Sequence, residues 1–251
     1  MNPKIFLLGG KDLEMLAIKE LLLTNHYREG VNLFDKCLSW GAKLSLYEDV
    51  IEANHNVIIY GIELIEDIEL PHNYRAIDHH NEKSHFASSL EQIADLLNIK
   101  LNTFQKLIAA NDSGYIPAMK KLGATEKQIL EIRQKDRAAQ GVSPADEQLA
   151  EKAIKHKTVK NGVVIIKSET SKFSTITDRM FEQQEELLIF SDDELCYYGT
   201  KRTPKLIELY SSLLKEGSAY YGGNKSFFGI NIHTEQKTKS IIYYVREITN
   251  L

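Results

Sequence analysis

The sequence predicts an α/β protein, with a mainly parallel sheet covered by helices on both faces and a smaller α+β domain across a cleft. In the first half, short apolar runs alternate with amphipathic helical segments, which is the pattern of a parallel sheet. Beyond Lys160 the pattern changes to closely spaced strand segments. A chain of 251 residues, 43% hydrophobic, can bury a sizeable core. We expect a first domain over 1–145, a connecting helix over 146–158 and a smaller domain over 159–251.

The elements of the first half follow from local signals. Short apolar runs predict strands, and apolar residues at helical spacing predict helices. Ser88 or Ser89, followed by Glu91 or Gln92, is typical of a capping box at a helix start. The predicted strands are 4–8, 43–47, 57–60 and 74–77, and the predicted helices are 13–23, a Ser-capped helix through 97, 103–110, 125–137 and 145–155.

The second half has fewer helical signals. Thr203-Pro204 is a strong helix start, and Gly217 is expected to end that helix. A further helix is predicted over 177–183. Strands are predicted over 163–167, 226–232 and 241–248, with a hairpin formed by 187–190 and 195–198.

Composition and charge limit the function classes. A formal net charge of -4 and a pI near 6.1 give no global basic field, so we expect no long nucleic acid as partner. Cys37 and Cys196 lie far apart and match no zinc spacing. No apolar run approaches the roughly 18 residues of a membrane span, and the N-terminal segment does not resemble a signal peptide. We therefore expect a cytoplasmic protein that does not enter a membrane.

Acidic and imidazole side chains follow the predicted strands. Asp78, His79 and His80 come directly after the strand over 74–77, while Asp12 and Glu63 follow two earlier strands. Parallel strands bring their carboxyl ends to one edge of the sheet, where such folds bind ligands. Carboxylate and imidazole groups are ligands for manganese, zinc and iron. The alternative is a polar turn after the strand, in which these acids only cap helices.

This arrangement resembles the DHH phosphoesterase superfamily. The resemblance rests on Asp78-His79-His80, on Asp112-Ser113-Gly114 downstream and on a glycine-rich segment near the C-terminus, and it covers both halves. The superfamily includes RecJ, oligoribonucleases, cyclic-dinucleotide phosphodiesterases and family II pyrophosphatases. The resemblance implies hydrolysis of a small phosphorylated compound or short oligonucleotide by attack of metal-bound water. It implies metal ligands at Asp12, Glu63, His79 and Asp112 and catalytic roles for Asp78 and His80, with His80 facing the substrate phosphate.

The first motif departs from the family pattern. Gly9-Gly10-Lys11-Asp12 lacks the histidine and one of the acids that the resemblance implies. We therefore expect one divalent ion, Mn²⁺ with Mg²⁺ and Zn²⁺ as alternatives, and a catalytic role for Lys11 as a substitute positive charge. A solvated surface position is the equally weighted alternative for Lys11. Glu14 could rebuild part of the lost site, but helical geometry favours different directions for Asp12 and Glu14.

The glycine-rich segment is the candidate substrate contact of the smaller domain. Gly222, Gly223, Asn224 and Lys225 occupy the place where the family binds substrate, although a simple hairpin turn fits the residues as well. Arg133 and Arg137 lie four positions apart and fit either a salt bridge with Asp136 or Glu131, or a phosphate contact. The alternative function is a catalytically impaired nucleotide-binding protein on the same fold. A homodimer is compatible with either function.

Overall fold

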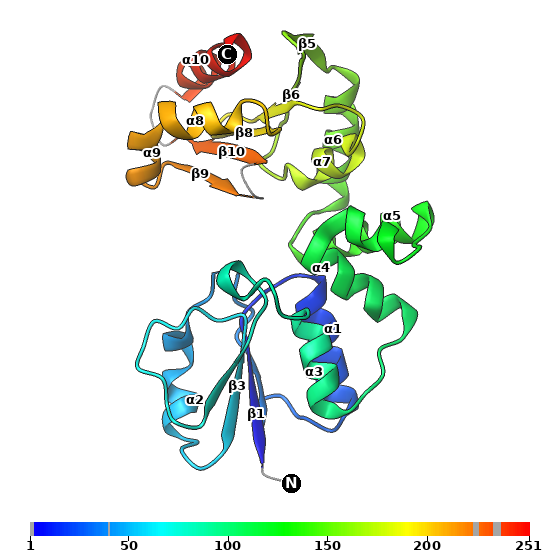
Figure 1. Cartoon of the computed structure of the whole chain (residues 1–251), viewed down its shortest axis with the longest axis vertical. Coiled ribbons are helices and arrows are strands. Elements are labelled where there is room, and N and C mark those ends of the chain that lie inside the picture. Colours follow the sequence, from blue (N-terminus) through cyan, green and yellow to red (C-terminus); the bar gives the residue numbers. More distant parts are fainter. Residues whose placement is uncertain (1–2, 40, 223–225, 233–236) are drawn as a thin grey trace. The chain divides into compact units, whose positions relative to one another are not determined.

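The computed structural model describes residues 3–39, 41–222, 226–232 and 237–251. The chain divides into two compact units, Met1–Gly141 and Val142–Leu251 (Figure 1). Each unit is built on a sheet of its own, with four strands in the first and six in the second.

The sheet of the first unit is fully parallel and has the strand order β2-β1-β3-β4. One predicted strand is wrong, because residues 44–47 form a 3₁₀ helix, η1. Leu44 and Tyr47 are three positions apart and both fully buried, and a helix with three residues per turn places them on the same side. The strands are β1 (Lys4–Leu8), β2 (Leu33–Asp35), β3 (Ile58–Ile62) and β4 (Tyr74–Ile77).

Helices cover both faces of this sheet, as the sequence predicts. α2 lies on one face, where it packs with η1 against Ile5, Leu7 and Ile59, while α1 and α3 lie on the other face (Figure 1). Ile5 and Leu7 share a face because side chains alternate along a strand. The helices of this unit are α1 (Leu13–Thr24), η1 (Leu44–Tyr47), α2 (Glu48–Glu52), η2 (Asn81–Lys83), α3 (Ser89–Leu97), α4 (Thr103–Lys121) and α5 (Glu126–Ala139).

Helix α4 is longer than expected and contains a sharp kink. It continues past Ala110, and the backbone leaves helical geometry at Gly114 and at Tyr115, which has φ 58° and ψ −151°. Asp112 therefore lies inside a helix just before the kink, which corrects the turn expected there. By contrast, α3 begins as expected, because Ser88 and Glu91 form the capping box.

The second unit contains a mixed sheet in the order β5-β6-β7-β8-β10-β9. Only β6 and β7 pair in parallel among the described strands of this sheet, and β7 with β8 forms the expected antiparallel hairpin. The strands are β5 (Thr158–Lys160), β6 (Val163–Lys167), β7 (Leu187–Phe190), β8 (Glu194–Tyr198), β9 (Ala219–Gly222) and β10 (Phe227–Asn231).

The helices of the second unit include one correction. The strand predicted over 241–248 is part of a helix, α10, in which Ile241 and Ile248 are buried two turns apart. The helix beginning at Thr203 ends at Leu209, and a short second helix ends at Lys215, before Gly217. The helices are α6 (Pro144–Lys155), α7 (Ser174–Met180), α8 (Thr203–Leu209), α9 (Ser211–Lys215) and α10 (Lys237–Asn250).

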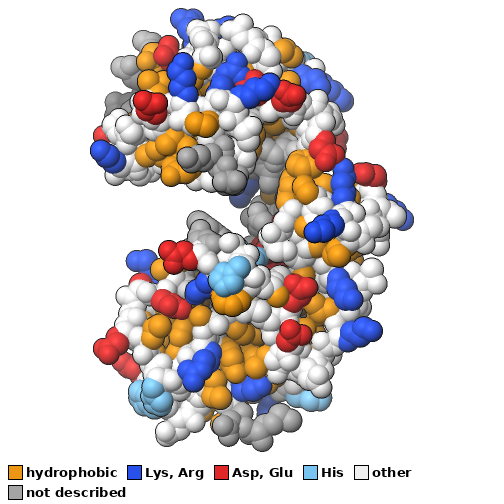
Figure 2. Space-filling model, viewed as in Figure 1, with side chains coloured by type: hydrophobic (Ala, Val, Ile, Leu, Met, Phe, Trp, Pro, Cys, Tyr) orange, Lys and Arg blue, Asp and Glu red, His pale blue; other side chains and the backbone are white. Residues whose placement is uncertain are grey.

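The charged side chains on the drawn face do not form a continuous basic band. In Figure 2, Lys and Arg side chains of both units stand among Asp and Glu side chains and hydrophobic patches. Within the described residues, no helix has the length and apolarity needed to cross a bilayer.

Candidate metal centre

The carboxyl ends of β1 and β3 lie unusually close together. The two strands are paired in parallel up to Leu8 and Ile62. A Cβ atom on Gly9, the next residue, would lie 2.4 Å from the carbonyl oxygens of Ile62 and Glu63. Only glycine fits this contact. The segment leading to Asp12 can therefore run beside Glu63 at the sheet edge.

His79 follows β4 at the same edge and is the centre of a cluster of acids. Its Nε2 atom lies 2.6 Å from Asp112 Oδ2, 3.4 Å from Glu14 Oε2 and 3.6 Å from Glu63 Oε1. Ligand atoms of Glu63, His79, His80 and Asp112 all lie within 4.8 Å of one another. The side chains come from α1, the ends of β3 and β4, and α4, so the fold brings together groups that are distant in sequence.

The four central atoms of this cluster are buried but lack well-formed hydrogen bonds. Glu14 Oε2, Glu63 Oε1, His79 Nε2 and Asp112 Oδ2 each have no hydrogen-bond partner, although they lie close to one another. Buried polar atoms without partners are costly, because their desolvation is not compensated. Three carboxylates and one imidazole directed at one point are a donor set that fits a divalent cation. The described residues therefore fit a metal ion here.

Glu14 changes the interpretation of the first motif. It is only 1% exposed, and its Oε1 accepts a hydrogen bond of 3.2 Å from the backbone N–H of Leu90 in the first turn of α3. Glu14, to which the sequence analysis gave less weight, thus lies at the acid cluster around His79. A glutamate among apolar residues at the start of α1 is the sequence signal that could have identified it.

Asp12 lies beside this cluster and caps helix α1. Its Oδ1 accepts a hydrogen bond of 2.8 Å from the backbone N–H of Met15. Burial, with the nearby charges of Asp112 and Glu63, raises the pKa of Asp12 to about 7. Asp12 is therefore available to an ion through Oδ2, but it is not among the residues that contact His79 Nε2.

The surrounding acids determine the protonation of His79 and Glu14 in the absence of an ion. Burial alone would lower the pKa of His79, but the carboxylates of Asp112, Glu14 and Glu63 raise it to about 12. Burial also raises the pKa of Glu14 well above its usual range. Without an ion, a proton on His79 thus supplies the positive charge that the carboxylates require.

Asp78 has partners of its own, unlike the cluster around His79. Its Oδ1 accepts from the backbone N–H of His80 at 2.9 Å and lies 3.1 Å from His80 Nδ1. Its Oδ2 lies 3.4 Å from the Lys83 ammonium. Burial opposes ionisation, but the contacts with His80 and Lys83 lower the pKa of Asp78 overall. Asp78 is therefore a carboxylate that orients His80.

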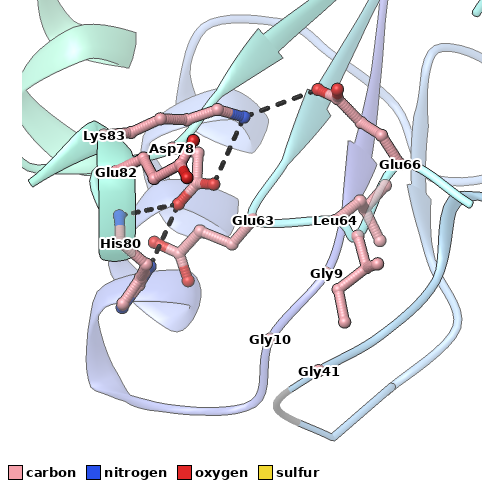
Figure 3. A pocket seen from close by; sticks show the side chains of 11 residues that line it. Gly9, Gly10, Gly41, Glu63, Leu64, Glu66, Asp78, His80, Glu82 and Lys83 are labelled. Carbon is pink, nitrogen blue, oxygen red and sulfur yellow. Dashed lines mark hydrogen bonds and ion pairs between the residues drawn. The ribbon is translucent and has the colours of Figure 1, made fainter.

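A cavity of about 360 Å³ opens next to these groups. Figure 3 shows His80, Asp78 and Glu63 on one side and the Lys83 ammonium reaching toward both Asp78 and Glu66. Lys83, which the sequence analysis did not select, is a cation on its wall. The lining residues are Gly9, Gly10, Gly41, Glu63, Leu64, Ile65, Glu66, Asp78, His80, Glu82 and Lys83.

The remaining candidate residues lie elsewhere. Lys11 is exposed and does not line this cavity. Gly222 is the last residue of β9 in the second unit. Gly223, Asn224 and Lys225 lie outside the described residues. The two arginines of α5 are buried, and Arg133 forms a salt bridge with Asp136, which is one of the alternatives that the sequence analysis left open.

Comparisons with known proteins identify the fold. No family model matches the chain, and no curated protein matches it. The solved structures that are similar over nearly the whole chain include the following three. The first is the DHH domain of a protein described as a member of a family of ribosomal proteins. It has 11% identity and a TM-score of 0.54, and the match covers 99% of this chain and 87% of the other.

The second is the pGpG-specific phosphodiesterase PggH from Vibrio cholerae, with 10% identity, a TM-score of 0.46, and coverage of 98% of this chain and 99% of the other. The third is RecJ from Thermus thermophilus in complex with Mn²⁺, with 9% identity, a TM-score of 0.49, and coverage of 99% and 51%. The similarity to the first of these structures shows that this chain shares the fold of a DHH-domain protein.

Proposed function

We propose that the protein is a divalent-metal-dependent phosphoesterase that hydrolyses a small phosphorylated compound or a short oligonucleotide. The observation that supports this most is the group of four buried ligand atoms without hydrogen-bond partners on Glu14, Glu63, His79 and Asp112. They lie beside a cavity with a histidine and a lysine on its wall. The DHH-domain fold adds support at the level of architecture.

We assign one tightly bound ion, Mn²⁺ in preference to Mg²⁺ or Zn²⁺, to this ligand set, with Asp12 alongside. Asp78 is not part of the set, because both of its oxygens already face His80 and Lys83. When bound, such an ion polarises a phosphoryl oxygen and lowers the pKa of water. His79 must lose its proton to act as a ligand.

The other residues handle the substrate. Asp78 holds the ring of His80 through Nδ1, so that the ring is oriented to stabilise negative charge that develops on a phosphate oxygen. Lys83 adds positive charge at the cavity wall. For Lys11, which does not line the cavity, we keep the proposed catalytic role as a substitute positive charge. Gly222, Gly223, Asn224 and Lys225 remain the proposed substrate contacts of the second unit.

A small substrate suits the charge distribution. Tracking a long nucleic acid requires many basic side chains, whereas the net charge is -4 and the cavity is lined by four acids and one lysine. Assembly as a homodimer and location in the cytoplasm remain predictions from the sequence.

The metal content of the purified protein, measured by mass spectrometry and followed by titration with Mn²⁺, tests the proposal. We expect one tight site in the wild type and none in His79→Ala. His85→Ala is the matched control, because His85 is exposed and contacts the backbone of Glu82 and the ring of Phe86, away from the acids around His79. Unchanged Mn²⁺ binding in His79→Ala would overturn the assignment.

The competing function is a nucleotide-binding protein without catalysis, favoured by the missing histidine of the first motif. Hydrolysis of bis(p-nitrophenyl) phosphate by the Mn²⁺-loaded protein distinguishes the two. An enzyme releases p-nitrophenolate and loses this activity in His80→Ala, while a binding protein shows no turnover but still binds nucleotides in the presence of the ion.

A further inference from the structure

Helix α5 supplies no ligand, but it packs against the two helices that do. Helix α1 carries Glu14 and is capped by Asp12, and helix α4 carries Asp112. Figure 1 shows α5 beside α4 at the end of α1. Two residues of α5, Arg133 and Asp136, are 8% and 4% exposed, so this charged pair is buried between the helices.

Arg133 contacts both sides of Asp112 along helix α4. Its Nη1 donates to Oδ1 of Asn111, the preceding residue, at 3.0 Å. Its guanidinium carbon lies 4.6 Å from the ring centroid of Tyr115, beyond the kink, which is within the range of a cation–π contact. The same Nη1 donates to Asp136 Oδ2 at 2.7 Å.

Asp136 extends this contact to helix α1. Its Oδ1 accepts from the backbone N–H of Leu13 at 3.2 Å, and Leu13 lies between Asp12 and Glu14. A chain of hydrogen bonds thus runs from the residue before Asp112, through Arg133 and Asp136, to the residue between the two acids of the first motif.

The backbone at the kink requires such support. Tyr115, at φ 58° and ψ −151°, is close to a conformation that is almost restricted to glycine. Non-glycine residues remain there only when their surroundings hold them. The kink begins two residues after Asp112, so the contacts of Arg133 with Asn111 and with the Tyr115 ring hold the backbone on both sides of Asp112.

We infer that Arg133 is a positioning residue of the metal centre, which holds Asp112 at the correct distance from Glu14 and His79. The inference rests on the proposed function, because it concerns the same ion site. Arginine suits this role, since its planar group can bond to two acceptors and stack on a ring at once. Lysine keeps the charge but cannot do both.

The experiment compares Arg133→Lys with the wild type in the full chain. Mn²⁺ affinity is measured by calorimetry, the visible spectrum of the Co²⁺-loaded protein reports ligand geometry, and thermal unfolding in EDTA reports stability. Groups that orient metal ligands typically change affinity about 10- to 100-fold. We expect Arg133→Lys to bind Mn²⁺ at least about tenfold more weakly and to alter the Co²⁺ spectrum.

Arg179→Lys is the control, because Arg179 forms a comparable pair with Glu147 and Glu151 in the second unit. It should leave Mn²⁺ affinity within about twofold of the wild type. Tyr115→Gly provides a second test that relieves the backbone while removing the stacked ring, and we expect about three- to tenfold weaker binding.

The outcomes separate the two proposals. A wild type that binds no Mn²⁺ overturns the proposed function and this inference with it. A wild type that binds Mn²⁺, with folded Arg133→Lys and Tyr115→Gly binding equally well, overturns only the role of Arg133. Lower thermal stability of Arg133→Lys with unchanged affinity and spectrum would likewise assign Arg133 to the fold alone. If Arg133→Lys does not fold, the affinity of Tyr115→Gly decides.

Discussion

Each unit buries a glutamate, and the two glutamates differ in their partners. Glu186 in the second unit is 5% exposed and faces the Arg202 guanidinium and the Tyr197 hydroxyl. Burial opposes its ionisation, but these partners lower its pKa overall. Glu14 in the first unit is 1% exposed and has one backbone donor, while burial and neighbouring acids raise its pKa.

This difference separates a structural charge from a ligand. The acid of Glu186 is balanced by a cation within the chain, so it contributes to the fold without any other group. Glu14 faces Glu63, Asp112 and His79, and its Oε2 has no hydrogen-bond partner. The positive charge that faces Glu14 is a proton on His79, which a metal ion can replace, whereas the Arg202 charge that faces Glu186 is permanent.

The largest effect should come from removing the two charges. We expect Glu14→Gln to weaken Mn²⁺ binding about 100-fold while leaving stability in EDTA unchanged or higher. Glu186→Gln should leave Mn²⁺ binding unchanged and lower the free energy of unfolding by about 3 kcal/mol, because the Arg202 charge is left uncompensated. Calorimetry and urea unfolding measure the two quantities. If Glu14→Gln and Glu186→Gln changed Mn²⁺ affinity and stability equally, the distinction between a ligand and a structural charge would be wrong.

The ion itself should stabilise one unit selectively. At a free Mn²⁺ concentration of about 100 times the dissociation constant, the stabilisation is about 2.7 kcal/mol. We expect slower hydrogen exchange in α1, α3 and α4, reversed by EDTA, and no change in β7 and β8. Exchange followed by mass spectrometry measures this, and equal protection of both units would contradict it.

The stability of the metal-free protein should fall as pH rises. Asp12 and His79 both bind protons more tightly in the folded chain, with pKa values raised to about 7 and about 12. A raised pKa stabilises the folded state at low pH, and the contribution of Asp12 is lost between its ordinary value near 3.8 and about 7. The contribution of His79 is lost above its ordinary value near 6.5.

We therefore expect the free energy of unfolding in EDTA to be about 2 kcal/mol lower at pH 8 than at pH 5. The same measurement on Asp12→Asn gives the contribution of the other groups, which is subtracted. Mn²⁺ binding near pH 7 should release at least one proton, since His79 must deprotonate. Calorimetry in buffers of different ionisation enthalpy measures the release. Binding without proton release would contradict the ligand role of His79.

The smallest effect concerns the two cysteines. Cys37 is exposed in the first unit, whereas Cys196 is buried in the second, where burial raises its pKa to about 12. We expect one thiol of the native protein to react rapidly with Ellman's reagent, without loss of stability, and both to react in denaturant. Rapid reaction in Cys37→Ser would show that the sheet of the second unit opens readily.

Much of the fold could be predicted from local sequence signals. Apolar runs identified β1, β3, β4 and the β7–β8 hairpin, and the Ser88 capping box identified the start of α3. Helix α10 was mistaken for a strand, because β-branched and aromatic residues such as Ile241 and Tyr244 favour strands locally. Only the burial of Ile241 and Ile248, two turns apart, reveals the helix.

The candidate-site residues that directly follow strands could be predicted from the sequence. The position of Glu14, next to the N-cap of α1, could not. Glu63 and His79 follow directly from the parallel sheet. Glu14 was given less weight because residues two apart on a helix point in different directions. Asp12 is not on the helix, however, since it is the N-cap with an extended backbone, φ −139° and ψ −174°. The rule that residues two apart on a helix point in different directions therefore does not apply to Asp12 and Glu14.

Because the ligands are far apart in the sequence, they are synthesised at different times. Asp12 and Asp112 are 100 positions apart, and Arg133 comes later still. At about 5–20 residues per second, the ribosome has already released the first acids several seconds before the last ligand is made. Until Asp112 is made, the ligand set around His79 is incomplete. The ligand set of the ion site is therefore complete only after most of the first unit has been made.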